Sequence, residues 1–121
     1  MKTQYVVEKR SGYLYIVVTG EYSQDEFLSY PKIVADECAK ANMNKVLVDA
    51  LSLIGANAPT MDRFFVGENI AKHFGTKIKL AVAWPKEYID KFTETVAVNR
   101  GAMVLVVGDV ETAEKWLLEN L

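Results

Sequence analysis

The alternation of hydrophobic and polar positions divides the chain into five strand-like runs and four helical stretches. Residues 5–9 and 13–19 are rich in Tyr, Val and Ile and are separated by a short turn, which is typical of a hairpin. Residues 46–48, 78–84 and 103–107 hardly alternate with polar residues. Such continuous apolar runs indicate strands that are covered on both faces.

The first helix is predicted after the hairpin. Ser23 and Glu26 have the spacing of a capping box, and Tyr22 and Phe27 flank it at the spacing of a hydrophobic staple. Pro31 lies inside the apolar stripe that follows. Because proline has no backbone N–H to donate and its ring clashes with the preceding turn, we expect either a kink at Pro31 or one short turn followed by a new helix with Pro31 in its first turn.

Three further helices are predicted over residues 60–74, over residues 87–98 and after Asp109, which is a suitable N-cap. Arg100 and Gly101 follow the second of these and suit a helix C-terminus. The order β-β-α-β-α-β-α-β-α favours parallel pairing with right-handed crossovers. We therefore expect one α/β domain over residues 1–121, with a mostly parallel five-stranded mixed sheet and helices on both faces.

Composition excludes several classes of function. The formal net charge of −2 argues against a nucleic-acid partner, which requires a concentrated basic surface. One cysteine, Cys38, and one histidine, His73, are too few for a structural zinc site, and a single cysteine suits a reducing compartment. No run is apolar enough for a signal peptide or a membrane span. We expect a cytoplasmic protein without membrane insertion, cofactor or metal.

The most informative local feature is the connection after the third strand. It takes about ten residues, 50–59, where such loops usually take about two to six. Ligands of open α/β sheets bind beyond the carboxyl ends of the strands, where this loop begins. The candidate partner- or ligand-binding residues at this edge are Asp49, Ser52, Asn57, Thr60, Asp62 and Trp84. The alternative is that the loop only packs its own Leu51, Leu53 and Ile54 against the sheet.

Catalytic interpretations are weaker. Ser52, His73 and Asp49 could form a triad, but no Gly-x-Ser-x-Gly elbow surrounds the serine. Asp49, Asp62 or Glu68 could hold a divalent metal, although carboxylates in such positions usually face solvent. Cys38 falls on an apolar helical stripe and is expected to be buried. We therefore predict no catalytic residue and a chain that is not an enzyme.

Several segments resemble the SpoIIAA-like, or STAS/SEC14-type, small bacterial proteins. They are residues 62–71 (Asp-Arg-Phe-Phe-Val-Gly-Glu-Asn-Ile-Ala), residues 91–102 and residues 114–117. The resemblance implies the fold of anti-sigma-factor antagonists and of the STAS domains of anion transporters, which act through protein contacts. The antagonists are switched by phosphorylation of a serine beside the helix after the third strand. Where they have Asp-Ser-Ser-Gly, this chain has Asn57-Ala58-Pro59-Thr60, so Thr60 and then Ser52 are the candidate phosphorylation sites.

Two functional hypotheses follow. The first is a regulatory STAS-like module that binds a protein partner or a small ligand through residues 49–62 and is switched by phosphorylation. The second is a carrier of a small apolar ligand, similar to CRAL-TRIO domains, with a pocket lined by Phe64, Phe65, Trp84 and Tyr88. Self-association, for example as a dimer, is a further expectation, because the terminal hairpin leaves an edge strand.

Overall fold

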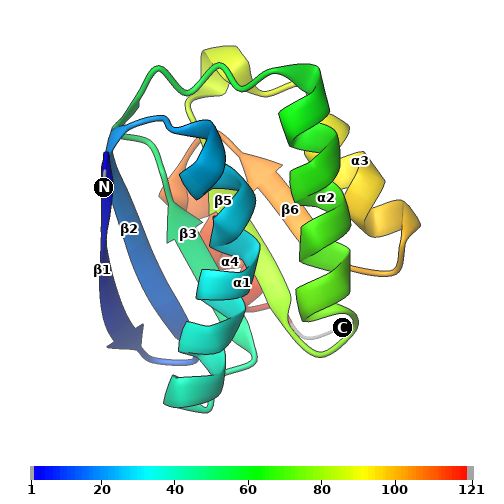
Figure 1. Cartoon of the computed structure of the whole chain (residues 1–121). Helices are drawn as coiled ribbons and strands as arrows, with labels where there is room; N and C mark the ends of the chain where they lie inside the picture. Colours follow the sequence, from blue (N-terminus) through cyan, green and yellow to red (C-terminus); the bar gives the residue numbers. More distant parts are fainter. Residues whose placement is uncertain (1, 120–121) are drawn as a thin grey trace.

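The structure is a computed structural model that describes residues 2–119. A mostly parallel sheet is packed between helices on both faces (Figure 1), so the predicted alternation of strands and helices is confirmed. The elements, in chain order, are β1 (Thr3–Arg10), β2 (Tyr13–Glu21), α1 (Gln24–Ala41), β3 (Lys45–Asp49), β4 (Leu53–Ile54), α2 (Thr60–Phe74), β5 (Lys79–Ala83), the 3-10 helix η1 (Lys86–Tyr88), α3 (Phe92–Asn99), β6 (Met103–Val107) and α4 (Val110–Leu117).

The sheet has the strand order β1-β2-β3-β5-β6, and β1 pairs with β2 antiparallel while the other neighbours are parallel. A sixth strand, β4, pairs with the end of β2 beyond β3. The expected count of five strands is therefore too low by one. Strand β4 has only two residues inside the long connection, which is too short to produce a hydrophobic period.

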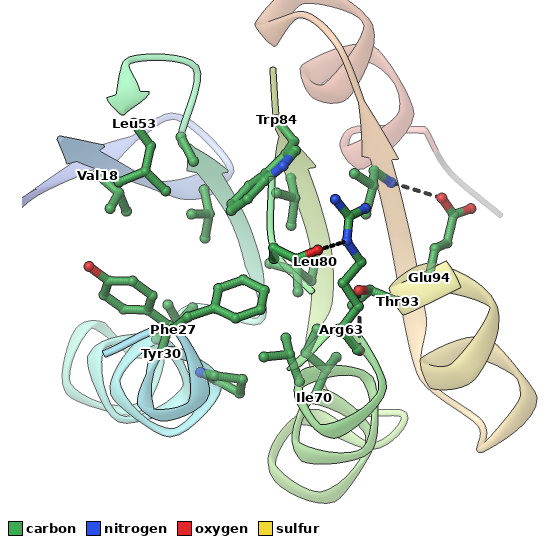
Figure 2. A pocket seen from close by; sticks show the side chains of 18 of the residues that line it. Val18, Phe27, Tyr30, Leu53, Arg63, Ile70, Leu80, Trp84, Thr93 and Glu94 are labelled. Carbon is green, nitrogen blue, oxygen red and sulfur yellow. Dashed lines mark hydrogen bonds between the residues drawn. The ribbon is translucent and has the colours of Figure 1, made fainter. Parts of the chain in front are cut away.

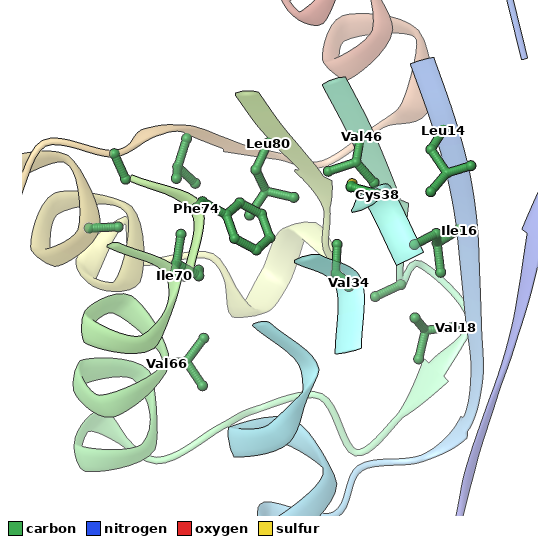
Figure 3. Close-up of a cluster of buried hydrophobic side chains, with 14 of the residues drawn as sticks. Leu14, Ile16, Val18, Val34, Cys38, Val46, Val66, Ile70, Phe74 and Leu80 are labelled. Atoms are coloured by element: carbon green, nitrogen blue, oxygen red, sulfur yellow. The ribbon is translucent and has the colours of Figure 1, made fainter. Parts of the chain in front are cut away.

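The two faces of the sheet are covered unequally. Helices α1, α2 and α3 cover one face, and α4 alone covers β3, β5 and β6 on the other (Figure 1). Figure 3 shows the larger core under the three helices, which includes Ile16, Val46, Leu80 and Phe74. Ala113 and Leu117 of α4 form the smaller core with Tyr13, Leu47 and Ala81. In the described part of the chain, none of the helices combines the length and apolar character that crossing a membrane requires.

The start of α1 differs from the predicted capping box. Ser23 occupies the N-cap position, but its side chain makes no capping hydrogen bond. The Glu26 carboxylate instead accepts the backbone N–H of Thr3 at 3.2 Å, because the start of β1 lies beside this turn. The hydrophobic staple is present, since the rings of Tyr22 and Phe27 lie 5.2 Å apart.

Helix α1 runs through Pro31 as one element. The alternative of two successive helices is therefore wrong. Pro31 is buried, so its packing against the core offsets the hydrogen bond that its nitrogen cannot donate.

The helix expected over residues 87–98 is interrupted. Residues 86–88 form η1, and α3 begins only at Phe92. The Asp90 carboxylate accepts the backbone N–H of Phe92 at 3.0 Å, and Lys91 adopts a left-handed φ of 65°. This local hydrogen bond competes with helical geometry, which is the reason that the hydrophobic period alone placed the helix start too early.

Two predicted helix ends are confirmed. Gly101 follows α3 with a φ of 96°, and Arg100 donates to the carbonyl of Val96 at 3.3 Å. Asp109 caps α4 and accepts the backbone N–H of Thr112 at 2.6 Å. The hydrogen bonds that Thr112 donates to Asp109 lower the pKa of the Asp109 carboxyl group.

Candidate functional site

The long connection from β3 to α2 crosses the edge of the sheet at which the parallel strands end (Figure 1). Its side chains divide into two groups. Leu53, Ala56 and Ala58 are buried, so the alternative interpretation is confirmed for Leu53, whereas it is wrong for Leu51 and Ile54, which are exposed. Ser52 and Asn57 are exposed. Thr60, also exposed, is the first residue of α2.

Asp62 is enclosed by other residues of the domain and is not open to solvent. Its side chain is buried, with 4% of the residue exposed. It accepts the hydroxyl of Tyr22 at 2.6 Å and the side-chain amide of Gln24 at 2.8 Å. Burial and the bond to Asp62 raise the pKa of Tyr22 well above its ordinary value. Asp62 therefore fastens the first turn of α2 to the residues that open α1.

Asp49 lies on the other face of the sheet, because the preceding residue, Val48, faces the three helices. Its carboxylate accepts the Tyr15 hydroxyl at 2.5 Å and the backbone N–H of Leu51 at 3.1 Å. Burial and this carboxylate raise the pKa of Tyr15 to about 12. Asp49 and Asp62 are thus engaged separately. Within residues 2–119, no group of three His, Cys, Asp or Glu side chains is close enough together to hold a metal ion.

The remaining candidate nucleophiles, Ser52 and Cys38, do not lie in a catalytic triad with His73. His73 is in the last turn of α2, and Ser52 precedes the start of that helix. The helix between them is about 20 Å long at roughly 1.5 Å per residue. Cys38 is buried as expected, and burial raises the pKa of its thiol to about 11. Its thiol is therefore protonated and inaccessible near neutral pH.

An apolar cavity of about 110 Å³ lies between α1, α2 and the sheet (Figure 2). Trp84 and Tyr88 line it, as the ligand-carrier hypothesis expected. The Trp84 indole is held in place, because its Nε1–H donates to the carbonyl of Ala56 at 3.1 Å and its ring lies 5.7 Å from that of Phe27.

Phe64 and Phe65 are not among the cavity-lining residues, so this part of the hypothesis is wrong. Phe65 is exposed, and Phe64 lies under the guanidinium of Arg100 at 5.5 Å. The reason is helical periodicity: the residues that α2 turns toward the cavity are Arg63, Val66, Ile70 and Phe74.

Arg63 is the residue that the sequence interpretation missed. It is 8% exposed and lines the cavity. Its Nε–H donates to the carbonyl of Ala58 at 2.7 Å, Nη2 donates to Asn57 Oδ1 at 3.4 Å, and Nη1 lies 2.9 Å from Asp90 Oδ1. The signal in the sequence was an arginine three residues before Val66 on an otherwise apolar helical stripe.

Solved structures with the same arrangement of elements identify the fold. No protein-family model matches the sequence, and no curated protein matches it. An anti-sigma factor antagonist from Mycobacterium paratuberculosis superposes with a TM-score of 0.64 at 10% identity, over 97% of this chain and 95% of that one. An uncharacterized DUF3478-family protein with a SpoIIAA-like fold, from Shewanella loihica PV-4, superposes with a TM-score of 0.53 at 16% identity, over 95% and 93%. The chain has a SpoIIAA-like fold.

Four exposed apolar side chains lie within one short segment of this SpoIIAA-like fold. They belong to the long connection and to the first two turns of α2, and they are Leu51, Ile54, Met61 and Phe65, called here the loop–α2 surface. Met61 and Phe65 are four residues apart and therefore project from the same side of the helix. Ser52 and Thr60 are the exposed hydroxyl residues next to Leu51 and Met61.

Proposed function

We propose that this chain is a non-catalytic regulatory module that binds a protein partner through the loop–α2 surface. The observation that carries the proposal is the concentration of exposed apolar side chains there. Nine large hydrophobic side chains are exposed within residues 2–119, and four of them lie in the short stretch from Leu51 to Phe65. Exposed apolar groups that cluster in this way favour a contact surface for another protein. The structural neighbour named as an anti-sigma factor antagonist supports a protein partner for the same fold.

Phosphorylation of Thr60, or secondarily of Ser52, is the regulatory step in this proposal. Both residues are exposed and adjoin the loop–α2 surface. A phosphate adds about −1.5 to −2 charge, and at Thr60 it would occupy the N-terminal turn of α2, where the helix dipole favours an anion. The added charge beside Met61 would weaken a contact that depends on desolvating apolar groups.

The direct test is affinity capture from cells of the source organism with matched variants. Met61→Ser and Phe65→Ser remove apolar area from the loop–α2 surface, and Val98→Ser is the control. Phe65 and Val98 are similarly exposed, at 44% and 46%, but Val98 lies near the end of α3. We expect the first two variants to lose a partner that wild type and Val98→Ser both retain. Retention by all variants, or equal loss in the control, would contradict the proposed surface.

The phosphorylation step has a separate test. Peptide mapping of the protein isolated from its native cells should find phosphate on Thr60 or Ser52. Thr60→Asp and Ser52→Asp should reduce capture of the partner, whereas Thr60→Val and Ser52→Ala should not. If neither residue ever carries phosphate and the Asp variants bind like wild type, the regulatory step is wrong while the contact surface stands.

A further inference from the structure

Two neighbouring rows of side chains cross strands β3, β5 and β6 on the face that the three helices cover. The row nearer the amino ends is buried and consists of Val46, Leu80 and Val104. The next row toward the carboxyl ends is only partly buried and consists of Val48, Val82 and Val106. Central strands under helices are normally closed along their whole length. The helical layer therefore stops short of the second row, and this row is the floor of the cavity in Figure 2.

The walls of the cavity are largely apolar. Phe27 and Tyr30 of α1 line one side, and Leu53 and Trp84 close the end near the carboxyl edge (Figure 2). An apolar cavity of about 150 Å³ binds benzene. Scaled from that case, the volume of about 110 Å³ suits a branched or cyclic hydrocarbon group of about four carbon atoms.

Arg63 supplies a buried positive charge on the lining of this apolar space. A guanidinium carries five N–H groups. Three contacts of Arg63 are made with Ala58, Asn57 and Asp90, and they involve three different nitrogen atoms. Nη1 and Nη2 each carry a second N–H, so the guanidinium keeps donor capacity beyond these three contacts.

Asp90 occupies the position that a ligand anion would take. Its side chain is about half exposed, at 52%, whereas that of Arg63 is 9% exposed. Asp90 lies in the short segment between η1 and α3, next to Lys91 with its left-handed backbone. Asp90 Oδ1 contacts both Arg63 and the backbone N–H of Phe92. Asp90 is therefore not a counter-ion of Arg63 alone.

We propose that this cavity binds a small monocarboxylic acid, with its compact apolar tail against the half-buried valine row and its carboxylate on Arg63. The ligand carboxylate takes over the ion pair as Asp90 turns toward solvent. Asp90 and Glu94 both line the cavity near this position, and their negative charges disfavour a doubly charged phosphate group. The site is separate from the loop–α2 surface, and its test requires only the purified chain.

The test is calorimetric titration with 3-methylbutanoate and cyclobutanecarboxylate, with 3-methylbutan-1-ol and cyclobutylmethanol as neutral counterparts. Asp90→Asn keeps an oxygen that can accept the N–H of Phe92 but removes the competing charge. We expect this variant to bind both acids about three- to fivefold more tightly and to leave the affinity for the alcohols unchanged. Arg63→Gln should weaken acid binding about tenfold or more. Arg100→Gln, which changes an arginine outside the cavity, should have no effect.

Val82→Phe places extra volume on the cavity floor and should abolish binding of acids and alcohols alike, with retention of the fold checked by its thermal unfolding. Alcohols that bind as tightly as the acids, or acid affinities that do not change in Asp90→Asn, would overturn the role of Arg63. Absence of binding by every probe, or binding that survives Val82→Phe in a folded protein, would overturn the site itself. Asp90→Asn is an exposed substitution, so the outcome does not depend on whether Arg63→Gln folds.

Discussion

Two tyrosine–carboxylate pairs shape the carboxyl edge of the sheet at the scale of single residues. Tyr22 binds Asp62 on the side of the three helices, and Tyr15 binds Asp49 on the side of α4. A buried carboxylate is costly unless hydrogen-bond donors surround it, and neutral hydroxyl groups meet that need here. These two aspartates, which the sequence suggested as ligand contacts, hold the long connection and its neighbours in place.

Removing the hydroxyl of Tyr22 should destabilise the domain. In Tyr22→Phe, Asp62 keeps the amide of Gln24 but loses its hydroxyl donor inside the protein. We expect the free energy of unfolding to fall by about 1–3 kcal/mol, measured by urea denaturation. Tyr88→Phe is the control, because the Tyr88 hydroxyl makes no hydrogen bond to other residues in the 2–119 range. Equal stability of the two variants would contradict the structural role of the pair.

The Tyr15 pair also predicts an alkaline transition. An unfolded tyrosine ionises near pH 10, whereas burial and Asp49 raise the pKa of Tyr15 to about 12 in the folded state. The stability that this pair contributes is therefore fully present below pH 10 and is lost as the pH rises from 10 to 12. Denaturation curves across this window should show a steeper fall for wild type than for Tyr15→Phe. Identical slopes would show that Tyr15 titrates alike in the folded and unfolded states.

At the scale of helices and strands, the packing of α2 on α3 depends on Gly67. A Cβ atom on Gly67 would lie 2.8 Å from the Cβ of Val96 and 2.9 Å from the carbonyl oxygen of Thr93. Thr93 in turn donates its hydroxyl to the carbonyl of Arg63 at 3.2 Å. The two helices thus approach closely at the point where α3 begins, and this approach sets the position of Arg63 beside Asp90.

Gly67→Ala should force these helices apart. Alanine is the better helix former, so propensity alone predicts a gain in stability. The clash with α3 should outweigh that gain and lower the free energy of unfolding by about 1–3 kcal/mol, measured by thermal and urea denaturation. Lys72→Ala, an exposed change on the same helix, should have little effect. A stabilised Gly67→Ala protein would mean that α2 and α3 pack less closely than the structure shows.

The elements that sequence reasoning recovered are those with a clear hydrophobic pattern over several residues. The continuous apolar runs of β3, β5 and β6 indicated strands covered on both faces, and the alternation with helices favoured parallel pairing. The failures are local. Strand β4 is too short to have a period, and the start of α3 is decided by one Asp90 side chain. Glu26 does not form the predicted capping box, because the start of β1, remote in sequence, supplies a donor to its carboxylate.

The site was less predictable than the fold. The prediction that Trp84 lines a pocket is confirmed. The sequence could not show that Asp49 and Asp62 face opposite sides or that Arg63 is buried, because these depend on which hydroxyl groups and carbonyls other elements bring near. Phe64 and Phe65 were assigned to the pocket from their aromatic character, although the helical period turns them away from it.

At the scale of the whole molecule, the proposed protein contact and the proposed ligand site lie at the same end but involve different residues. The residues of the loop–α2 surface are exposed. The cavity lies between α1 and α2, beneath the long connection that joins β3 to α2 (Figure 2). Strand β1 forms one edge of the sheet and exposes Val6, which is the region that would mediate self-association. Charged residues at its end, Glu8 to Arg10, oppose such pairing.

Site-specific photo-cross-linking in cells of the source organism tests the proposed protein contact most directly. A benzophenone amino acid replaces Phe65 in one protein and Val98 in another, two positions of matched exposure on different helices. We expect a discrete cross-linked protein of constant mass from position 65 and none from position 98. The amount of the cross-linked product from position 65 should fall when Thr60→Asp is also introduced. Cross-links that are absent at position 65, or equal at both positions, would contradict a partner on the loop–α2 surface.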